Sequence, residues 1–189
     1  MPQPILSRRT ILAGCALAAI VPALPRRPQA AELSEDGLYQ QPWFLQSFLD
    51  LREDFQAARS AGKTFAVLWE LKGCPYCKLL HKVNFANPKI AAYAKENFVF
   101  LQLNLIGSRP VTDFDGTELP EKAMAQKQEV QGTPTIQFFM DSEGDTARES
   151  GRTQYLKPDE FLGMLRFVRE KAYETTPFDE WLRANPQDV

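Results

Sequence analysis

Apolar residues gather in three runs that predict β-strands, at residues 64–71, 98–104 and 136–140. The first run is apolar from Phe65 to Trp69, which is typical of a strand covered on both faces. The third is followed by a turn signal at residues 141–144, so it predicts an antiparallel hairpin.

Apolar residues at spacings of three and four predict helices around these strands. The first predicted helix runs from Pro42 to Gly62 and adds an N-terminal helix to the fold. Its single apolar stripe contains Phe44, Phe48, Leu51, Phe55 and Ala58. Further helices are predicted from Pro75 to Val83, from Pro88, over residues 121–130 and from Pro158, with loose segments at 32–41 and 106–116.

Helices and strands alternate along the chain until the hairpin near its end. This order predicts an α/β fold, a three-layer α/β/α sandwich with a mixed central sheet. The first two strands run parallel, because a helical crossover connects them. A chain of 189 residues can bury a sizeable core, and we expect residues 32–189 to form one domain.

The first 31 residues have the pattern of an export signal. Arg8 and Arg9 stand directly before an apolar stretch, and no acidic residue precedes Glu32. The small residues Ala30-Ala31 mark the end of the signal, where cleavage is expected. Paired arginines in this position indicate the twin-arginine route. We therefore expect a periplasmic protein with no stable membrane insertion once the signal is removed.

Removal of residues 1–31 changes the charge and the cysteine count. It leaves 18 Lys and Arg against 24 Asp and Glu, a formal charge of −6. This acidic balance argues against nucleic acid as a partner. Of three cysteines, Cys74 and Cys77 remain. A disulfide across two residues closes too short a loop to stabilise the fold much, so we assign this pair to redox chemistry.

The two cysteines lie where a strand passes into a helix. Pro75 is suited to the first helical turn, which puts Cys74 at the helix N-terminus. Backbone N–H groups there favour a thiolate, and we assign Cys74 as the attacking sulfur. Cys77, expected to be more buried, resolves the mixed disulfide.

Neighbouring residues are candidates for tuning and support. Lys72, Lys78 and His81 add positive charge, although His81 also fits a surface histidine without function. Glu70 is either a proton carrier or a solvated group at the strand end. Tyr76 either offers an apolar surface beside the sulfurs or is simply an exposed aromatic residue.

The chain resembles the thioredoxin superfamily in Cys74-Pro75-Tyr76-Cys77 after a strand and in Thr133-Pro134 before the next strand but one. This resemblance implies a thioredoxin fold in which Pro134 is cis and packs beside the disulfide. It also implies that the Thr133 backbone pairs with an extended substrate.

Over residues 42–183 the chain is also similar to exported thioredoxins of bacterial sulfur-oxidation (Sox) systems, the SoxW type. The stretches that carry this likeness are residues 73–78, 83–85, 111–116 and 133–136. The likeness implies a periplasmic dithiol protein that a membrane thiol transporter keeps reduced. The chain departs from ordinary thioredoxin at three places. Gly73 replaces a tryptophan, and Pro75-Tyr76 replaces Gly-Pro. Leu68 replaces the buried aspartate, whose proton-relay role could pass to Glu70.

We therefore expect a periplasmic thiol–disulfide oxidoreductase that reduces protein or small-thiol disulfides, with no cofactor besides the Cys74–Cys77 disulfide and no metal. A disulfide oxidase or isomerase of the same fold is the main alternative, because sequence does not set the direction of electron flow. Cys74, Cys77 and His81 would give a metal site only three ligands, and a closed zinc site needs four. A copper carrier that uses the two thiolates is a less favoured alternative. A non-catalytic binding module would leave the cysteine pair unexplained.

Overall fold

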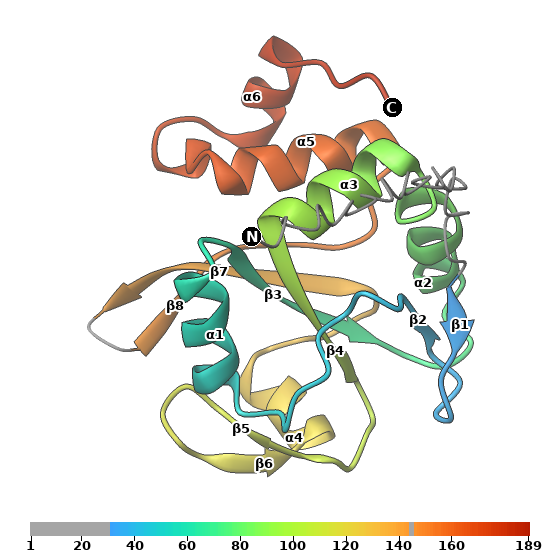
Figure 1. The fold of residues 1–189 in the computed structure, drawn as a ribbon, viewed down its shortest axis with the longest axis vertical. Helices are drawn as coiled ribbons and strands as arrows, with labels where there is room; N and C mark the ends of the chain where they lie inside the picture. Colours follow the sequence, from blue (N-terminus) through green and yellow to red (C-terminus); the bar gives the residue numbers. More distant parts are fainter. Residues whose placement is uncertain (1–30, 144–145) are drawn as a thin grey trace, which may run out of the picture.

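A four-stranded mixed sheet forms the centre of the protein in a computed structural model that describes residues 31–143 and 146–189. The strand order is β4–β3–β7–β8 (Figure 1). The strands are β3 (Thr64–Glu70), β4 (Phe98–Asn104), β7 (Thr135–Glu143) and β8 (Thr146–Thr153). Strands β3 and β4 are parallel, whereas β7 is antiparallel to both β3 and β8. The predicted mixed sheet is confirmed, and the export signal lies outside the described residues except for Ala31.

Helices cover both faces of this sheet, as the three-layer prediction requires. The helical segments are α1 (Leu51–Ser60), α2 (Pro75–Leu79), the π-helical turn η1 (Leu80–Asn84), α3 (Pro88–Asn97), α4 (Glu121–Lys127), α5 (Pro158–Arg169), the 3₁₀ turn η2 (Ala172–Glu174) and α6 (Phe178–Ala184). Side chains of η1, α3 and α5 pack in one apolar layer, and those of α1 and α4 pack in the other. None of the helices in the described ranges is long and apolar enough to cross a membrane.

Strand β3 contributes to both layers in strict alternation. Ala66 and Leu68 face the η1–α3–α5 layer, whereas Phe65, Val67 and Trp69 face the α1–α4 layer. All seven residues of the strand are buried. The side-chain period of two therefore explains why this run is continuously apolar in the sequence.

The predicted first helix is wrong at its start, because α1 begins at Leu51 and not at Pro42. Leu49 has a positive φ of 64°, which interrupts helical geometry. The Asp50 side chain then caps α1 by accepting hydrogen bonds from the N–H groups of Arg52 and Glu53. The predicted stripe is consequently divided: Phe44 lies in the η1–α3–α5 layer, Phe48 is fully exposed, and Leu51, Phe55 and Ala58 lie in the opposite layer.

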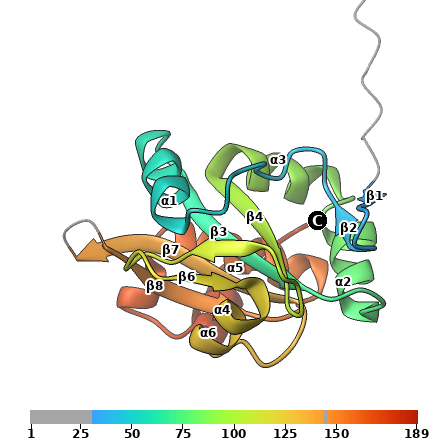
Figure 2. The same ribbon diagram turned by 90° about the horizontal axis from the view of Figure 1, so that it is seen from below.

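Two segments predicted to lack regular structure contain short hairpins. Strands β1 (Glu32–Leu33) and β2 (Tyr39–Gln40) pair near the N-terminus. Strand β5 (Pro110–Thr112), inside the loop predicted at 106–116, pairs with β6 (Glu118–Pro120) just after it. The first hairpin lies beside α2 in both views of the molecule (Figures 1 and 2). It thus brings the N-terminal segment to the end of the sheet where β3 meets α2.

Candidate functional site

The Cys74–Cys77 pair lies directly beyond the carboxyl end of β3. The chain turns at Gly73, whose positive φ of 80° strains any side chain larger than hydrogen. Cys74 is the N-cap of α2 and Pro75 its first residue, as the sequence predicted. The two cysteines form a disulfide with Cα atoms 5.3 Å apart.

The two sulfurs have different surroundings. Cys77 is buried, whereas Cys74 is partly exposed. The Cys77 N–H donates a hydrogen bond of 3.0 Å to Cys74 Sγ. In the reduced protein this donor and the helix N-terminus favour a thiolate at Cys74. The expected difference in burial between the two cysteines is confirmed.

Thr133 and Pro134 meet this disulfide from the start of β7. The peptide bond between them is cis, as the family resemblance implied. The Thr133 carbonyl oxygen lies 3.4 Å from Cys74 Sγ, although 59 residues separate the two in the chain. The fold therefore places the partly exposed sulfur against the Thr133–Pro134 backbone.

A groove of about 340 Å³ adjoins this contact. Its lining residues are Tyr76, Thr133, Pro134, Gln154 and Tyr155. The rings of Tyr76 and Tyr155 are 5.5 Å apart and tilted by 35°. The sequence indicated neither Gln154 nor Tyr155, because both lie in the link between β8 and α5, which only the folded chain brings to α2.

Glu70 and His81 form a buried pair. Both side chains are about 1% exposed, and His81 Nε2 lies 3.0 Å and 3.1 Å from the two carboxylate oxygens of Glu70. The interpretations of Glu70 as a solvated strand end and of His81 as a surface residue are therefore wrong. Glu70 points to the same side of β3 as Ala66 and Leu68, toward η1, where His81 is located.

Two glutamines complete the surroundings of this pair. The Gln41 side-chain N–H group donates to His81 Nδ1 (3.2 Å) and to the His81 carbonyl oxygen (3.4 Å). Nδ1 is then an acceptor, so Nε2 carries the proton and donates to Glu70. The Gln102 side-chain N–H group donates to Glu70 and to the Tyr39 carbonyl oxygen. Of these four residues, the sequence indicated Glu70 and His81 but not Gln41 and Gln102. The signal for Gln102 was a polar residue inside an apolar strand.

The candidate cations at positions 72 and 78 are exposed on either side of the disulfide. The aliphatic part of Lys72 lies against Gly37, where an added Cβ would be 3.0 Å from Lys72 Cδ. Lys78 projects from α2. Both ring nitrogens of His81 are engaged by Gln41 and Glu70, and no cluster of three potential metal ligands occurs in residues 31–143 and 146–189.

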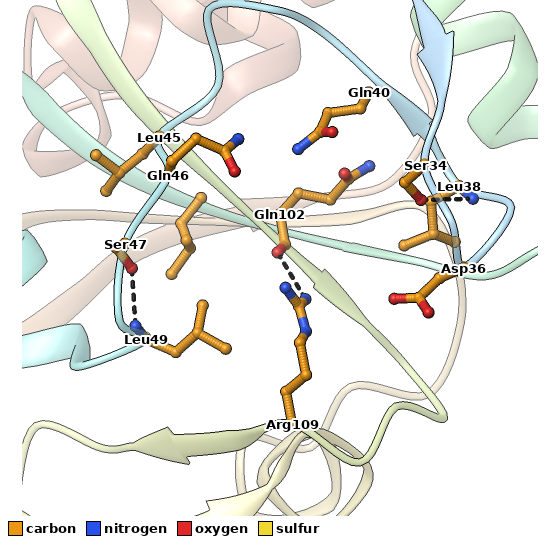
Figure 3. Close-up of a pocket in the computed structure, with 11 residues that line it drawn as sticks. Ser34, Asp36, Leu38, Gln40, Leu45, Gln46, Ser47, Leu49, Gln102 and Arg109 are labelled. Carbon is orange, nitrogen blue, oxygen red and sulfur yellow. Dashed lines mark hydrogen bonds between the residues drawn. The ribbon is translucent and has the colours of Figure 1, made fainter.

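A second, smaller cavity of about 70 Å³ lies between the N-terminal segment and β4 (Figure 3). Arg109 points into it and donates to the Gln102 carbonyl oxygen. A hydrogen bond of 2.5 Å from Arg109 to the buried Glu121 carboxylate raises the Arg109 pKa. The cavity has room for about two water molecules. Its size excludes a peptide, so we place the candidate site at the groove beside the disulfide.

The fold and the cysteine pair define a protein of the thioredoxin class. Residues 51–169 match the family model described as a thioredoxin-like domain, and the chain belongs to this family. The family and the disulfide together support a function of the thiol–disulfide oxidoreductase type.

Two solved structures show the same fold. A thioredoxin-fold protein from Helicobacter pylori is 26% identical, with a TM-score of 0.51 over 65% of this chain and 79% of that chain. A thioredoxin from Thermus thermophilus is 24% identical, with a TM-score of 0.50 over 63% of this chain and 83% of that chain. None of the curated proteins matches the chain.

Replacement of Glu70 by alanine should lower the free energy of unfolding by about 3–5 kcal/mol, because it leaves the His81 Nε2–H and one of the two Gln102 N–H groups buried without an acceptor. Urea denaturation of the oxidised protein measures this loss. Glu70→Gln is the matched control, since its amide oxygen can still accept from His81 and the loss should be smaller. A Glu70→Ala protein within about 0.5 kcal/mol of wild type, the range of ordinary surface substitutions, contradicts the structural role given to Glu70.

Proposed function

We propose that this protein is a periplasmic thiol–disulfide oxidoreductase that reduces disulfides of proteins or small thiols. The observation that carries this proposal is the contact of the partly exposed Cys74 Sγ with the Thr133 backbone beside an open groove. An extended substrate segment in that groove can pair with the Thr133 backbone and bring its disulfide to Cys74.

The reaction begins with the Cys74 thiolate, which attacks one sulfur of the substrate disulfide. A bond forms between Cys74 and that sulfur, the substrate S–S bond breaks, and the departing substrate thiolate takes up a proton. Cys77 then loses its proton and attacks Cys74 Sγ. The Cys74–Cys77 disulfide forms and the second substrate thiolate leaves and is protonated. The substrate gains two electrons and two protons, and the protein dithiol is oxidised.

Glu70 and His81 are our candidates for the proton of Cys77. His81 follows Cys77 by four residues in the continuous segment α2–η1, which puts the two side chains about one helical turn apart. Burial of a carboxylate beside a histidine costs desolvation free energy, and such pairs are often retained for function. In this proposal Glu70 takes over the relay role that Leu68 cannot perform, and Lys72 and Lys78 favour the Cys74 thiolate by their charge.

Export by the twin-arginine route and reduction by a membrane thiol transporter belong to the same proposal. The support for export is the sequence pattern of residues 1–31, and the support for the transporter is the resemblance to the SoxW type. The oxidised protein would accept two electrons from the transporter dithiol by the reverse of the exchange described above.

Replacement of Arg8 and Arg9 by lysine should abolish export, because the twin-arginine route requires the arginine pair. Fractionation of a bacterial host that has this route, followed by immunoblotting, measures the periplasmic share. The matched control is the pair Arg26→Lys and Arg27→Lys, which makes the same change outside the motif. Equal periplasmic amounts of all three proteins would contradict the assigned route.

Cys74→Ser should reduce insulin-reduction activity to the uncatalysed rate, because the attacking sulfur is lost. Cys77→Ser should instead accumulate a mixed disulfide with the physiological partner, because nothing resolves it. Non-reducing electrophoresis and mass spectrometry of the trapped species identify that partner. Retained activity of Cys74→Ser, or trapping by Cys74→Ser in place of Cys77→Ser, contradicts the assigned roles.

The reduction potential distinguishes a reductase from a disulfide oxidase or isomerase. A reductase should lie nearer to the value of about −270 mV that is typical of thioredoxin than to the value of about −120 mV of a strong oxidant. Equilibration of the Cys74–Cys77 pair with dithiothreitol or glutathione buffers measures this potential. A value near about −120 mV would contradict the reductase assignment and favour a disulfide oxidase.

A further inference from the structure

An exposed apolar row leads away from the disulfide along α2 and η1. Tyr76, Leu79 and Val83 are 55%, 39% and 42% exposed. Their spacings of three and four residues place them on one face of the helical segment. Tyr76 also lines the groove beside Pro134, so the row continues from the candidate substrate site.

A set of exposed lysines accompanies this row. Lys72, Lys78 and Lys82 are exposed, and none of them forms an ion pair with a carboxylate in the described parts of the chain. The Lys82 ammonium lies 5.4 Å from the centre of the Tyr39 ring. These three lysines are thus not held in ion pairs with carboxylates of the described residues.

The charge of this segment is opposite to that of the rest of the chain. Residues 71–95 contain five lysines and no acidic residue, whereas the chain from Glu32 onward carries 24 acidic residues against 18 basic ones. Glu70, which precedes the segment, is buried and bonded to His81. Glu35 and Asp36 stand directly before Gly37, which lies against Lys72, so the charge argument rests on Lys78 and Lys82.

We propose that the docking face, defined as Tyr76, Lys78, Leu79, Lys82 and Val83, binds a protein segment that carries acidic and apolar side chains beside its disulfide. This inference rests on the proposed function and names its substrate class. Apolar side chains of the partner cover the row, and its carboxylates approach the lysines. Complementary charge also raises the rate of encounter with such a partner.

The length of the docking face selects a protein segment over a small thiol. Seven residues separate Tyr76 from Val83, which corresponds to about 10 Å along the helix axis. A small disulfide bound at Cys74 contacts the Tyr76 end of the row. Contact with Lys82 and Val83 as well requires a chain that continues beyond the reacting sulfur.

Two synthetic peptides test the charge preference. They share one intrachain disulfide and its immediate neighbours, and differ only in four flanking residues, which are glutamate in one peptide and lysine in the other. The measured quantity is the ratio of their kcat/KM values, in which any change in the shared disulfide chemistry cancels. At low salt we expect the wild-type protein to favour the glutamate peptide at least tenfold. Salt at about 1 M should remove most of this preference, because it screens surface charges.

Charge reversal on the docking face supplies the decisive variant. Lys78→Glu with Lys82→Glu should invert the ratio so that the lysine peptide is favoured. The matched control is Arg166→Glu with Arg183→Glu, which changes the net charge equally on exposed residues of α5 and α6 and should leave the ratio as in wild type. A wild-type ratio near one, or an equal shift in the control protein, overturns the inference.

A second pair of peptides tests whether the apolar row contacts the partner. Leu79→Ser with Val83→Ser should raise KM for a glutamate peptide that carries leucines opposite this row at least fivefold, and should affect the same peptide with serines in their place less. Phe48→Ser, which removes a fully exposed apolar side chain elsewhere, should leave both KM values unchanged. Equal effects of the row variant on both peptides contradict apolar docking.

Oxidised glutathione separates failure of this inference from failure of the proposed function. If the protein reduces glutathione disulfide but shows no preference between the two peptides, the docking face is overturned and the proposed oxidoreductase function stands. No reduction of glutathione disulfide, insulin or either peptide overturns the proposed function and the inference together.

Discussion

The burial of β3 on both faces is the constraint on which the rest of the structure depends. Its alternating side chains belong to two apolar layers, and helices must therefore cover the sheet on either side. The strand ends at Glu70, and the turn at Gly73 delivers Cys74 to the N-terminus of α2. A buried strand in register with β4 and β7 thus fixes the position of the sulfurs against the Thr133–Pro134 backbone.

The same strand introduces polar atoms into the core at its carboxyl end. Glu70, His81, Gln41 and Gln102 bond to one another in a region that is otherwise lined by aromatic rings, including Phe44 and Phe85 at 5.6 Å from the His81 ring. Such a network is stable only when its members are satisfied together. It ties the N-terminal segment, β3, β4 and η1 to the element that carries Cys77.

The outer surface of that element differs from its inner surface in chemistry. Inward-facing residues such as Cys77, Leu80 and His81 are buried, whereas the docking face presents apolar and cationic side chains to solvent. Exposed apolar residues in one row are unusual enough to indicate an interaction site when charge complementarity accompanies them. The buried side of this short helical segment would then hold Cys77, and its exposed side would recognise the partner beside the groove.

The sequence by itself determined the four strands of the central sheet, its mixed three-layer arrangement and the place of the cysteines at a strand–helix junction, because periodicity and residues such as Pro75 act locally. It missed the two short hairpins β1–β2 and β5–β6. It misplaced the start of α1, where Leu49 and the cap at Asp50 divide an apparently continuous stripe. Only the tertiary structure decided that Glu70 and His81 are buried together and that Tyr155 lies against Tyr76. These contacts join residues far apart in the chain, and their partners are set by packing across layers, which no local pattern records.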